Sequence, residues 1–138
     1  SIFNKGFVIK SNENFEAVMR ACSQIKRKHE DSTWINEDFV QAYTNLHHLD
    51  IAFSIECYLN EELVGGLYGL LIGNIFCGES MFAKVTDASK VAFYHLCQQA
   101  EENGIKLIDC QVYNDHLASL GAYEISREKY FEILNENI

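Results

Sequence analysis

Residues 63–73 read LVGGLYGLLIG, and residues 76–82 read FCGESMF. The preceding residues 52–59, AFSIECYL, have the period of an extended chain, and short polar turns separate the three runs. Apolar runs of this length joined by tight turns are typical of antiparallel hairpins. The sequence therefore predicts a meander of three antiparallel strands at residues 52–59, 63–72 and 75–82.

Two helices are predicted before the meander, after a short strand at residues 7–10. In the first, apolar residues at positions 15, 18, 19, 22 and 25 recur at helical spacing, and Asn12 or Asn14 can cap it. We expect this helix to end in a charged break over residues 26–32. The second begins after Asn36, a good capping residue.

The period changes again after the meander. A long helix is predicted over residues 88–103, with Asp87 or Thr86 as its N-cap and Gly104 just beyond its end. The following elements are predicted as a strand at residues 106–112, a helix at 115–120 and a tail helix at 126–134 that Ser126 caps.

This order of elements predicts an α+β fold. Antiparallel hairpins followed by a strand–helix–strand crossover give a mixed α/β sheet with helices on both faces. The plan resembles that of the GNAT-like acyl-CoA N-acyltransferases.

Length, composition and charge limit the classes of protein. The 138 residues are 48% hydrophobic, which predicts one globular domain over residues 1–138. No apolar run reaches the ~20 residues of a membrane helix, so we expect no membrane contact. The five cysteines form no CxxC pattern and no histidine lies beside them, which indicates reduced thiols, a cytoplasmic protein and no metal site. The net charge of −9 is unfavourable for a free-standing RNA binder.

Polar residues within apolar strands are the candidate chemical groups. Asp109 and Gln111 flank Cys110, so period two places both on one face of a strand. Such a pair can hold an amine nucleophile or form an ordinary buried hydrogen bond. Glu79 is costly to bury unless it is paired, and Gly78 beside it allows a ligand to approach the backbone. The residues alone leave both interpretations open.

Several strings, in this order and spacing, resemble the leucyl/phenylalanyl-tRNA–protein transferases. They are TWINEDFVQAYTNLHHL at 33–49, the pair Ser54 and Glu56, GES at 78–80, DCQ at 109–111 and HLASLGA at 116–122. The resemblance implies the GNAT-like fold and transfer of Leu or Phe, with Met as a further candidate, from aminoacyl-tRNA to proteins with an N-terminal Arg or Lys. This reaction marks proteins for degradation by the N-end rule. It implies no cofactor, and we expect a monomer.

The resemblance also implies roles for individual residues. The catalytic group is Asp109, Gln111 and Glu79. The substrate-binding group, whose apolar members also fit plain core packing, is Leu67, Phe76, Gly78, Ser80, Phe93, Leu96, Ala100, Ile108 and Trp34. The tRNA-binding group, which also fits a solvated surface, is Lys90, Ser89, Lys26, Arg27 and Lys28.

Some positions depart from the family pattern. Phe53 stands where the family has a histidine, Tyr58 where it has a tryptophan, Asp50 where a glycine is usual and Ser126 where a proline is usual. The family also has a further N-terminal segment that these residues do not match. We expect either a shortened form of a longer protein or a natural single-domain relative.

Two alternatives remain open. One is a CoA-dependent N-acyltransferase of the same fold. Such enzymes have a glycine-containing loop for the pyrophosphate before the long helix, whereas residues 83–90 read AKVTDASK. The other is a non-catalytic remnant that binds peptide N-termini.

Overall fold

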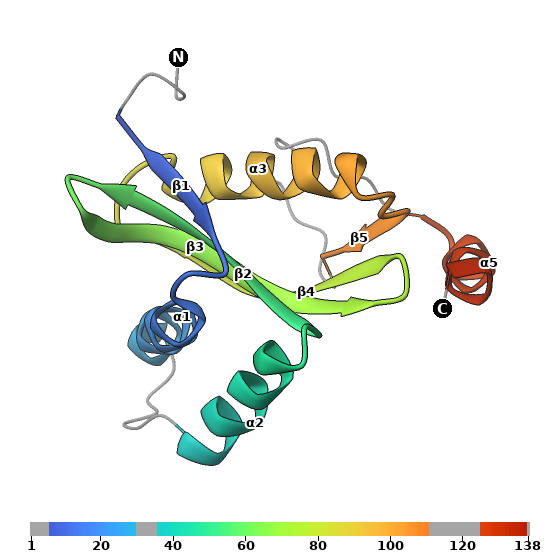
Figure 1. Cartoon of the computed structure of the whole chain (residues 1–138), viewed down its shortest axis with the longest axis horizontal. Helices are drawn as coiled ribbons and strands as arrows, with labels where there is room; N and C mark the ends of the chain where they lie inside the picture. Colours follow the sequence, from blue (N-terminus) through green and yellow to red (C-terminus); the bar gives the residue numbers. More distant parts are fainter. Residues whose placement is uncertain (1–5, 30–35, 111–124, 138) are drawn as a thin grey trace.

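The computed structural model describes residues 6–29, 36–110 and 125–137 (Figure 1). These residues form a five-stranded sheet in the order β1-β2-β3-β4-β5. The first four strands pair antiparallel, and β5 lies parallel to β4. The strands are β1 Val8–Ser11, β2 Ala52–Leu59, β3 Glu62–Ile72, β4 Ile75–Ala83 and β5 Leu107–Asp109. The predicted meander and the mixed sheet are confirmed.

Helices cover both faces of this sheet, as the sequence predicts (Figure 1). α3 packs on one face, and α1 and α2 lie on the other. The helices are α1 Phe15–His29, α2 Glu37–His48, α3 Ala88–Glu102 and α5 Arg127–Asn137. The helix expected at residues 115–120 lies outside the described residues. Within the described part of the chain, no helix is both long and apolar enough to cross a membrane.

Two of the expected helix ends have the predicted caps. The Asn36 side chain accepts a hydrogen bond from the Phe39 N–H at 3.1 Å, and the Ser126 hydroxyl accepts one from the Lys129 N–H at 3.0 Å. Gly104 follows α3 with a φ of +72°, a left-handed conformation that glycine adopts without steric cost.

Other expectations about the helix ends were wrong. α1 continues to His29, so the charged break does not begin at residue 26; lysine and arginine are good helix formers and the helix extends past its apolar face. Asp87 holds the N-cap position of α3 but makes no side-chain capping bond, because its backbone is left-handed at φ 73°. Of the two residues expected to cap α1, Asn14 directly precedes the helix and its carbonyl accepts from the Val18 N–H at 3.2 Å, whereas the Asn12 side chain accepts from the Ser54 N–H at 2.8 Å.

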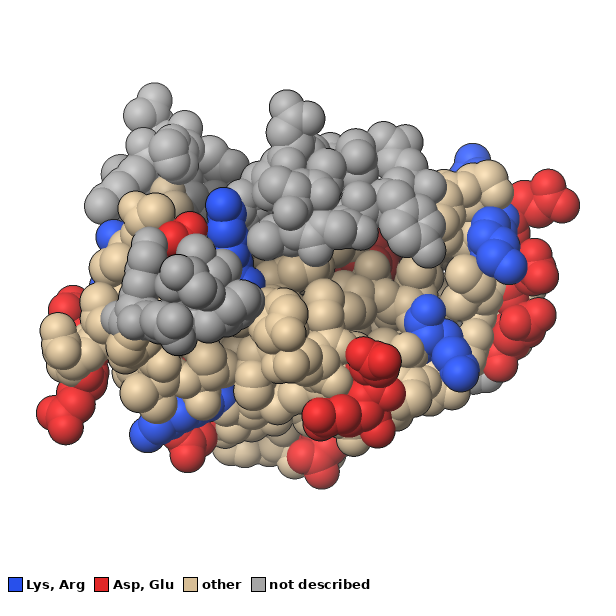
Figure 2. Space-filling model, turned by 90° about the horizontal axis from the view of Figure 1, so that it is seen from above, with Lys and Arg blue, Asp and Glu red and all other residues tan. Residues whose placement is uncertain are grey.

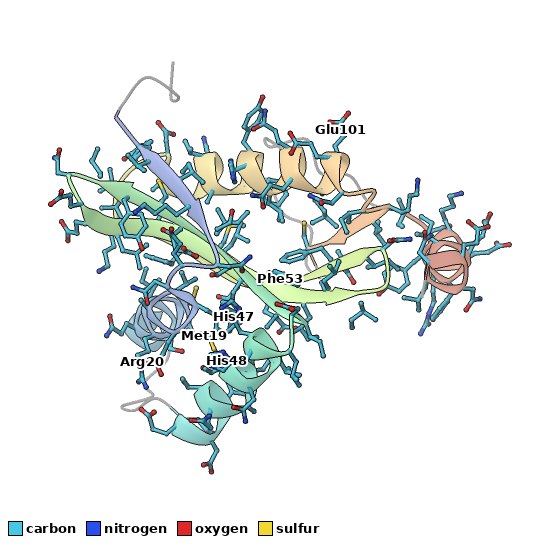
Figure 3. All side chains as sticks on the ribbon, in the orientation of Figure 1. Met19, Arg20, His47, His48, Phe53 and Glu101 are labelled. Atoms are coloured by element: carbon cyan, nitrogen blue, oxygen red, sulfur yellow. The ribbon has the colours of Figure 1, made fainter. Side chains whose placement is uncertain are left out.

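The core is divided between the two faces of the sheet. On the α1 side, buried residues of α1 and α2 pack against Ala52, Tyr68 and Phe82 of the strands; Figure 3 shows Met19 of α1 beneath the sheet. On the α3 side, Ile55, Leu67, Phe76, Ala92, Phe93 and Leu96 pack together. Alternation along each strand assigns a side chain to one face or the other.

The position of α2 is fixed at both of its ends. Near its start, Glu37 receives two hydrogen bonds from the Arg20 guanidinium of α1, at 3.0 and 2.9 Å. At its end, His47 Nδ1 donates to the Ala52 carbonyl at 2.8 Å, and its ring stacks on Phe15 with centroids 4.6 Å apart (Figure 3). A bidentate arginine–carboxylate pair restricts orientation as well as distance. α2 is therefore held in one orientation over the sheet.

A buried acid joins α1 to β2. Glu56 is fully buried, and it accepts hydrogen bonds from the Ser54 hydroxyl at 2.5 Å and from the Glu13 N–H at 3.0 Å. Burial of a carboxylate is tolerated where such donors are present. The Ser54–Glu56 pair of the sequence thus anchors the segment that leads into α1.

We expect two isoleucines that flank the β3–β4 turn to contribute very differently to the stability of the fold. Ile72 and Ile75 face each other across it, but Ile75 is fully buried and Ile72 is 41% exposed. Ile75→Ala should lower the free energy of unfolding by about 2–5 kcal/mol, because it leaves a cavity. Urea unfolding measures this value. Ile72→Ala is the matched control and should stay within about 0.5 kcal/mol; equal effects of the two substitutions would contradict the assigned burial.

Candidate functional site

Glu79 lies at an irregularity in β4. The register pairs Tyr68 with Ser80 but Gly69 with Gly78, so Glu79 is an extra residue without a partner on β3. A bulge of this kind changes the direction of the side chains that follow it. As a result Glu79 and Ser80 both face the α1 side of the sheet, where Ser80 hydrogen-bonds with Cys22.

A tyrosine of α2 contacts the Glu79 carboxylate. The pKa of the half-buried Tyr43 is raised by burial, by the charge of Glu79 and by a hydrogen bond with Glu79. A phenol in this position stays protonated near neutral pH. Glu79 is therefore half-buried and lies against Tyr43.

Asp109 lies on the neighbouring strand, opposite a residue two positions before Glu79. It is the last residue of β5, and the parallel register places it next to Cys77. Its Oδ2 accepts a hydrogen bond from the Tyr130 hydroxyl of α5 at 3.0 Å. Cys77 pairs with Leu70, which packs against the α1-side core, so Asp109 faces the same side of the sheet as Glu79.

Cys77 lies between the two acids. Burial raises the pKa of its thiol, and the negative charges of Asp109 and Glu79 raise it further. We call Cys77, Glu79 and Asp109, with Tyr43 and Tyr130, the acid face. It holds two carboxylates, each hydrogen-bonded with a tyrosine, and a protonated thiol. Across the described residues, no group of three or more His, Cys, Asp or Glu is arranged to hold a metal ion.

The predicted apolar substrate residues lie on the other face of the sheet. Leu67, Phe76, Phe93 and Leu96 are buried together on the α3 side, with Ile108 packed against them. Ala100 is buried one turn after Leu96 on α3. β4 and β5 therefore separate these apolar residues from the acids, which lie on the α1 side of the sheet.

Gly78 connects these two faces. It lies between Cys77 and Glu79 and its missing side chain would point to the α3 side. A Cβ placed there would meet the Asp109 carbonyl oxygen at 3.4 Å and no other described atom within 4 Å. Among the described residues, the β4 backbone therefore leaves room for close approach at Gly78, one residue after the Cys77–Asp109 pair.

The structure describes the side chains of only two candidate tRNA contacts, Ser89 and Lys90. Ser89 and Lys90 open α3, beyond the end of β4, and the Lys90 ammonium lies 3.9 Å from Asp87. Residues 26–28 belong to the end of α1, and their side chains, like Trp34 and Gln111, lie outside what the structure describes. Figure 2 shows the described lysines and arginines of one face interspersed with acids rather than gathered into a basic patch.

Two tyrosines of the acid face were not predicted as functional. Tyr43 has helical spacing with Phe39 and Val40, which suggested only packing. The contact between Tyr130 and Asp109 joins residues 21 positions apart in sequence, and no spacing rule predicts it.

Solved structures define the class of the fold. An aminoglycoside acetyltransferase from an uncultured soil metagenomic sample, in complex with trehalose, superposes with a TM-score of 0.68 at 14% identity, over 90% of this chain and 94% of that one. A predicted acetyltransferase from Clostridium acetobutylicum, with acetyl-CoA, gives 0.64 at 12% identity, over 88% and 92%. The chain has the fold of the GNAT acetyltransferases.

Sequence comparison identifies the family within that fold. The family model described as leucyl/phenylalanyl-tRNA protein transferase matches residues 1–135. Relatives of that name are 50% identical over 134 residues in Flavobacterium johnsoniae and 46% identical over 132 residues in Teredinibacter turnerae. Each match covers 96% of this chain but only 63% and 51% of the relative. The chain belongs to the leucyl/phenylalanyl-tRNA–protein transferase family.

The ionisation of Cys77 tests the geometry of the acid face without any assay of transfer. The pKa of its thiol should lie above the ordinary ~8.5, and Asp109→Asn or Glu79→Gln should each lower that pKa, because each removes a neighbouring negative charge. The pH dependence of iodoacetamide alkylation, followed at Cys77 by mass spectrometry, measures this value. Asp38→Asn on the exposed side of α2 is the control; an equal shift in that variant would show that the acids are not close to the thiol.

Proposed function

We propose that this chain transfers Leu or Phe from aminoacyl-tRNA to the N-terminal Arg or Lys of a protein. The observation that best supports this is the pair Glu79 and Asp109 on one face of the sheet where β5 ends, in a chain of this family. The chain spans about half to two thirds of the length of its relatives, so the activity is assigned as a proposal to the part they share. We propose that residues 1–138 act as one transferase domain, as a cytoplasmic monomer.

The acceptor is a cation, and the acid face suits it. A protein that begins with Arg or Lys has a positive side chain next to its α-amine. Two half-buried carboxylates attract both groups, and the net charge of −9 attracts such a substrate over a longer range. We assign Glu79 and Asp109 to binding and orienting the acceptor, together with Gln111.

The chemistry requires positioning more than activation. The acceptor α-amine, whose pKa is ~7.7, is partly free base at neutral pH, and the aminoacyl ester is already activated. The amine nitrogen attacks the ester carbonyl, the new C–N bond forms and the C–O bond to the tRNA ribose breaks. The amine loses a proton and the ribose oxygen gains one. Correct placement of the two reactants can contribute several kcal/mol to lowering the barrier, on the order of ~7 or more in favourable cases.

The protonated state of Cys77 favours direct transfer. A thiol must ionise before it can attack an ester, and burial with two neighbouring acids opposes that ionisation. A covalent acyl-enzyme on Cys77 is therefore disfavoured. The amine attacks the aminoacyl ester itself.

The apolar side chain of the amino acid needs a different environment from the acceptor. We assign this role to Leu67, Phe76, Phe93, Leu96, Ala100 and Ile108 on the α3 side. Gly78 leaves room beside the β4 backbone, so an aminoacyl group there can reach that cluster while its carbonyl stays near the acid face. Each CH₂ that the cluster buries contributes ~0.8 kcal/mol, so the identities of Leu96 and Ala100 set the preference among apolar amino acids. Ser80 and Trp34 remain proposed substrate contacts.

The tRNA partner requires positive charge, and we propose Ser89, Lys90, Lys26, Arg27 and Lys28 for phosphate contacts. The N-terminus of α3 has N–H groups and a dipole that favour an anion.

We expect Asp109→Ala and Gln111→Ala to abolish most transfer while the fold is retained. Each removes a polar group proposed to orient the amine, and a loss of about 10²-fold or more is typical of misplaced reactants. The assay follows labelled Leu and Phe from charged tRNA to a protein with an N-terminal Arg, with circular dichroism as the check of folding. Asp38→Ala, an exposed acid on α2, should transfer normally. Wild-type rates in the Asp109 variant would refute the assigned site.

Cys77→Ser should keep a transfer rate within about threefold of the unaltered chain, because serine retains a small neutral side chain and direct transfer needs no thiolate. Single-turnover transfer of labelled Phe measures the rate. Loss of transfer to the level of Asp109→Ala, together with a labelled thioester on the unaltered chain, would establish an acyl-enzyme instead.

A further inference from the structure

α5 is attached to the sheet without burying any of its own residues. At its C-terminal end, the Asn137 carbonyl accepts a hydrogen bond from the Asn74 N–H at 2.8 Å. Near its start, Tyr130 donates to Asp109 at 3.0 Å. Phe131, the next residue, is 46% exposed. Ile133 and Leu134 of α5 are only half-buried, so the hydrogen bonds of Tyr130 and Asn137 contribute to fixing this helix against the sheet.

We propose that Tyr130 is a positioning residue for the transfer reaction, whose hydroxyl holds the Asp109 carboxylate in the orientation that receives the acceptor amine. This inference rests on the proposed function. It goes beyond it, because it assigns a specific role to α5 and to a residue that no sequence motif indicates.

The place of Asp109 explains why it needs such a partner. β5 is only three residues long, and Asp109 ends it in the last pair of the register, beside Cys77. A carboxylate at a strand end can rotate about χ1 and χ2. A hydrogen bond from a group on a separate helix restricts that rotation, and bonds to ionised acceptors are stronger than neutral ones.

A neutral donor also suits a site that must bind a cation. The hydrogen bond with Asp109 is the main cause that raises the pKa of Tyr130, with burial and the Asp109 charge adding to it, so the phenol stays protonated at neutral pH. A lysine or arginine in its place would neutralise Asp109 and repel the acceptor. Tyrosine orients the carboxylate and leaves its negative charge in place.

A tyrosine also lies against the other acid. Burial and the proximity of Glu79 raise the pKa of Tyr43 of α2, a helix whose orientation the Arg20–Glu37 pair and His47 fix. Each carboxylate thus has a tyrosine from a different helix beside it. Tyr43 approaches from α2, and Tyr130 from the exposed α5.

The kinetic test removes one hydroxyl. Tyr130→Phe should lower kcat for transfer about ten- to a hundredfold, which corresponds to loss of one hydrogen bond to a charged group. KM for the acceptor protein should change less than about twofold, because orientation acts mainly on the transition state. Tyr94→Phe on α3, which removes a hydroxyl from an exposed helix surface away from the acids, is the matched control.

A spectroscopic test does not depend on turnover. In the chain labelled with ¹³Cζ-tyrosine, the NMR signal that disappears in Tyr130→Phe reports the titration of Tyr130. Its pKa should lie above the ordinary ~10 and should fall in Asp109→Asn, because the charge that opposes ionisation is removed. The same signal should be unaffected by Asp38→Asn.

The outcomes separate this inference from the proposed function. A Tyr130 titration that does not respond to Asp109→Asn overturns the contact. An unchanged kcat in Tyr130→Phe, where Asp109→Ala abolishes transfer, overturns the positioning role and leaves the function intact. No transfer by the unaltered chain, under conditions in which the Flavobacterium johnsoniae relative is active, overturns the proposed function and with it the role of Tyr130 in transfer.

Discussion

The site depends on one extra residue in a strand. In a regular strand, successive side chains point to opposite faces of the sheet. Without the extra residue, β4 could therefore place Cys77 and Glu79 on the α1 side, or Ser80 and Phe82, but not both pairs. The bulge at Glu79 removes that restriction. Ser80 and Phe82 can pack against the α1-side core, while Glu79 and Cys77 form the acid face with Asp109. Packing and chemistry thus occupy the same face of the same strand.

In the proposed function, this arrangement divides the reaction between two surfaces. A cationic acceptor requires negative charge, whereas an apolar aminoacyl side chain requires apolar contacts. One small volume cannot provide both environments, because burial among apolar groups makes an unpaired charge costly. The sheet separates them, with the tyrosine-held carboxylates on one face and the Leu67–Phe76 cluster on the other. We propose that the reactive ester bridges the two at Gly78, because a Cβ built there would meet no described atom within 4 Å except the Asp109 carbonyl oxygen.

Much of the fold follows from local sequence rules. The short polar turns predict the hairpins. Asn36 and Ser126 predict where two helices begin, and Gly104 predicts where one ends. Asp109 and Glu79 were identifiable as polar residues within apolar strands. The division of the site between two faces was not predictable, because it depends on a bulge that depends on tertiary pairing. Nor was the Tyr130 contact, since α5 has no periodic apolar face that would indicate how it docks.

The most direct test of the two-surface account is a crystal structure of the chain with an amide-linked phenylalanyl-adenosine, which cannot be hydrolysed. We predict that its carbonyl lies beside the β4 backbone at Gly78, within reach of Glu79 and Asp109, and that its phenyl ring contacts Leu67 and Phe76 on the α3 side. A ligand bound away from the β4–β5 junction, or with its phenyl ring on the acid face, would contradict the account.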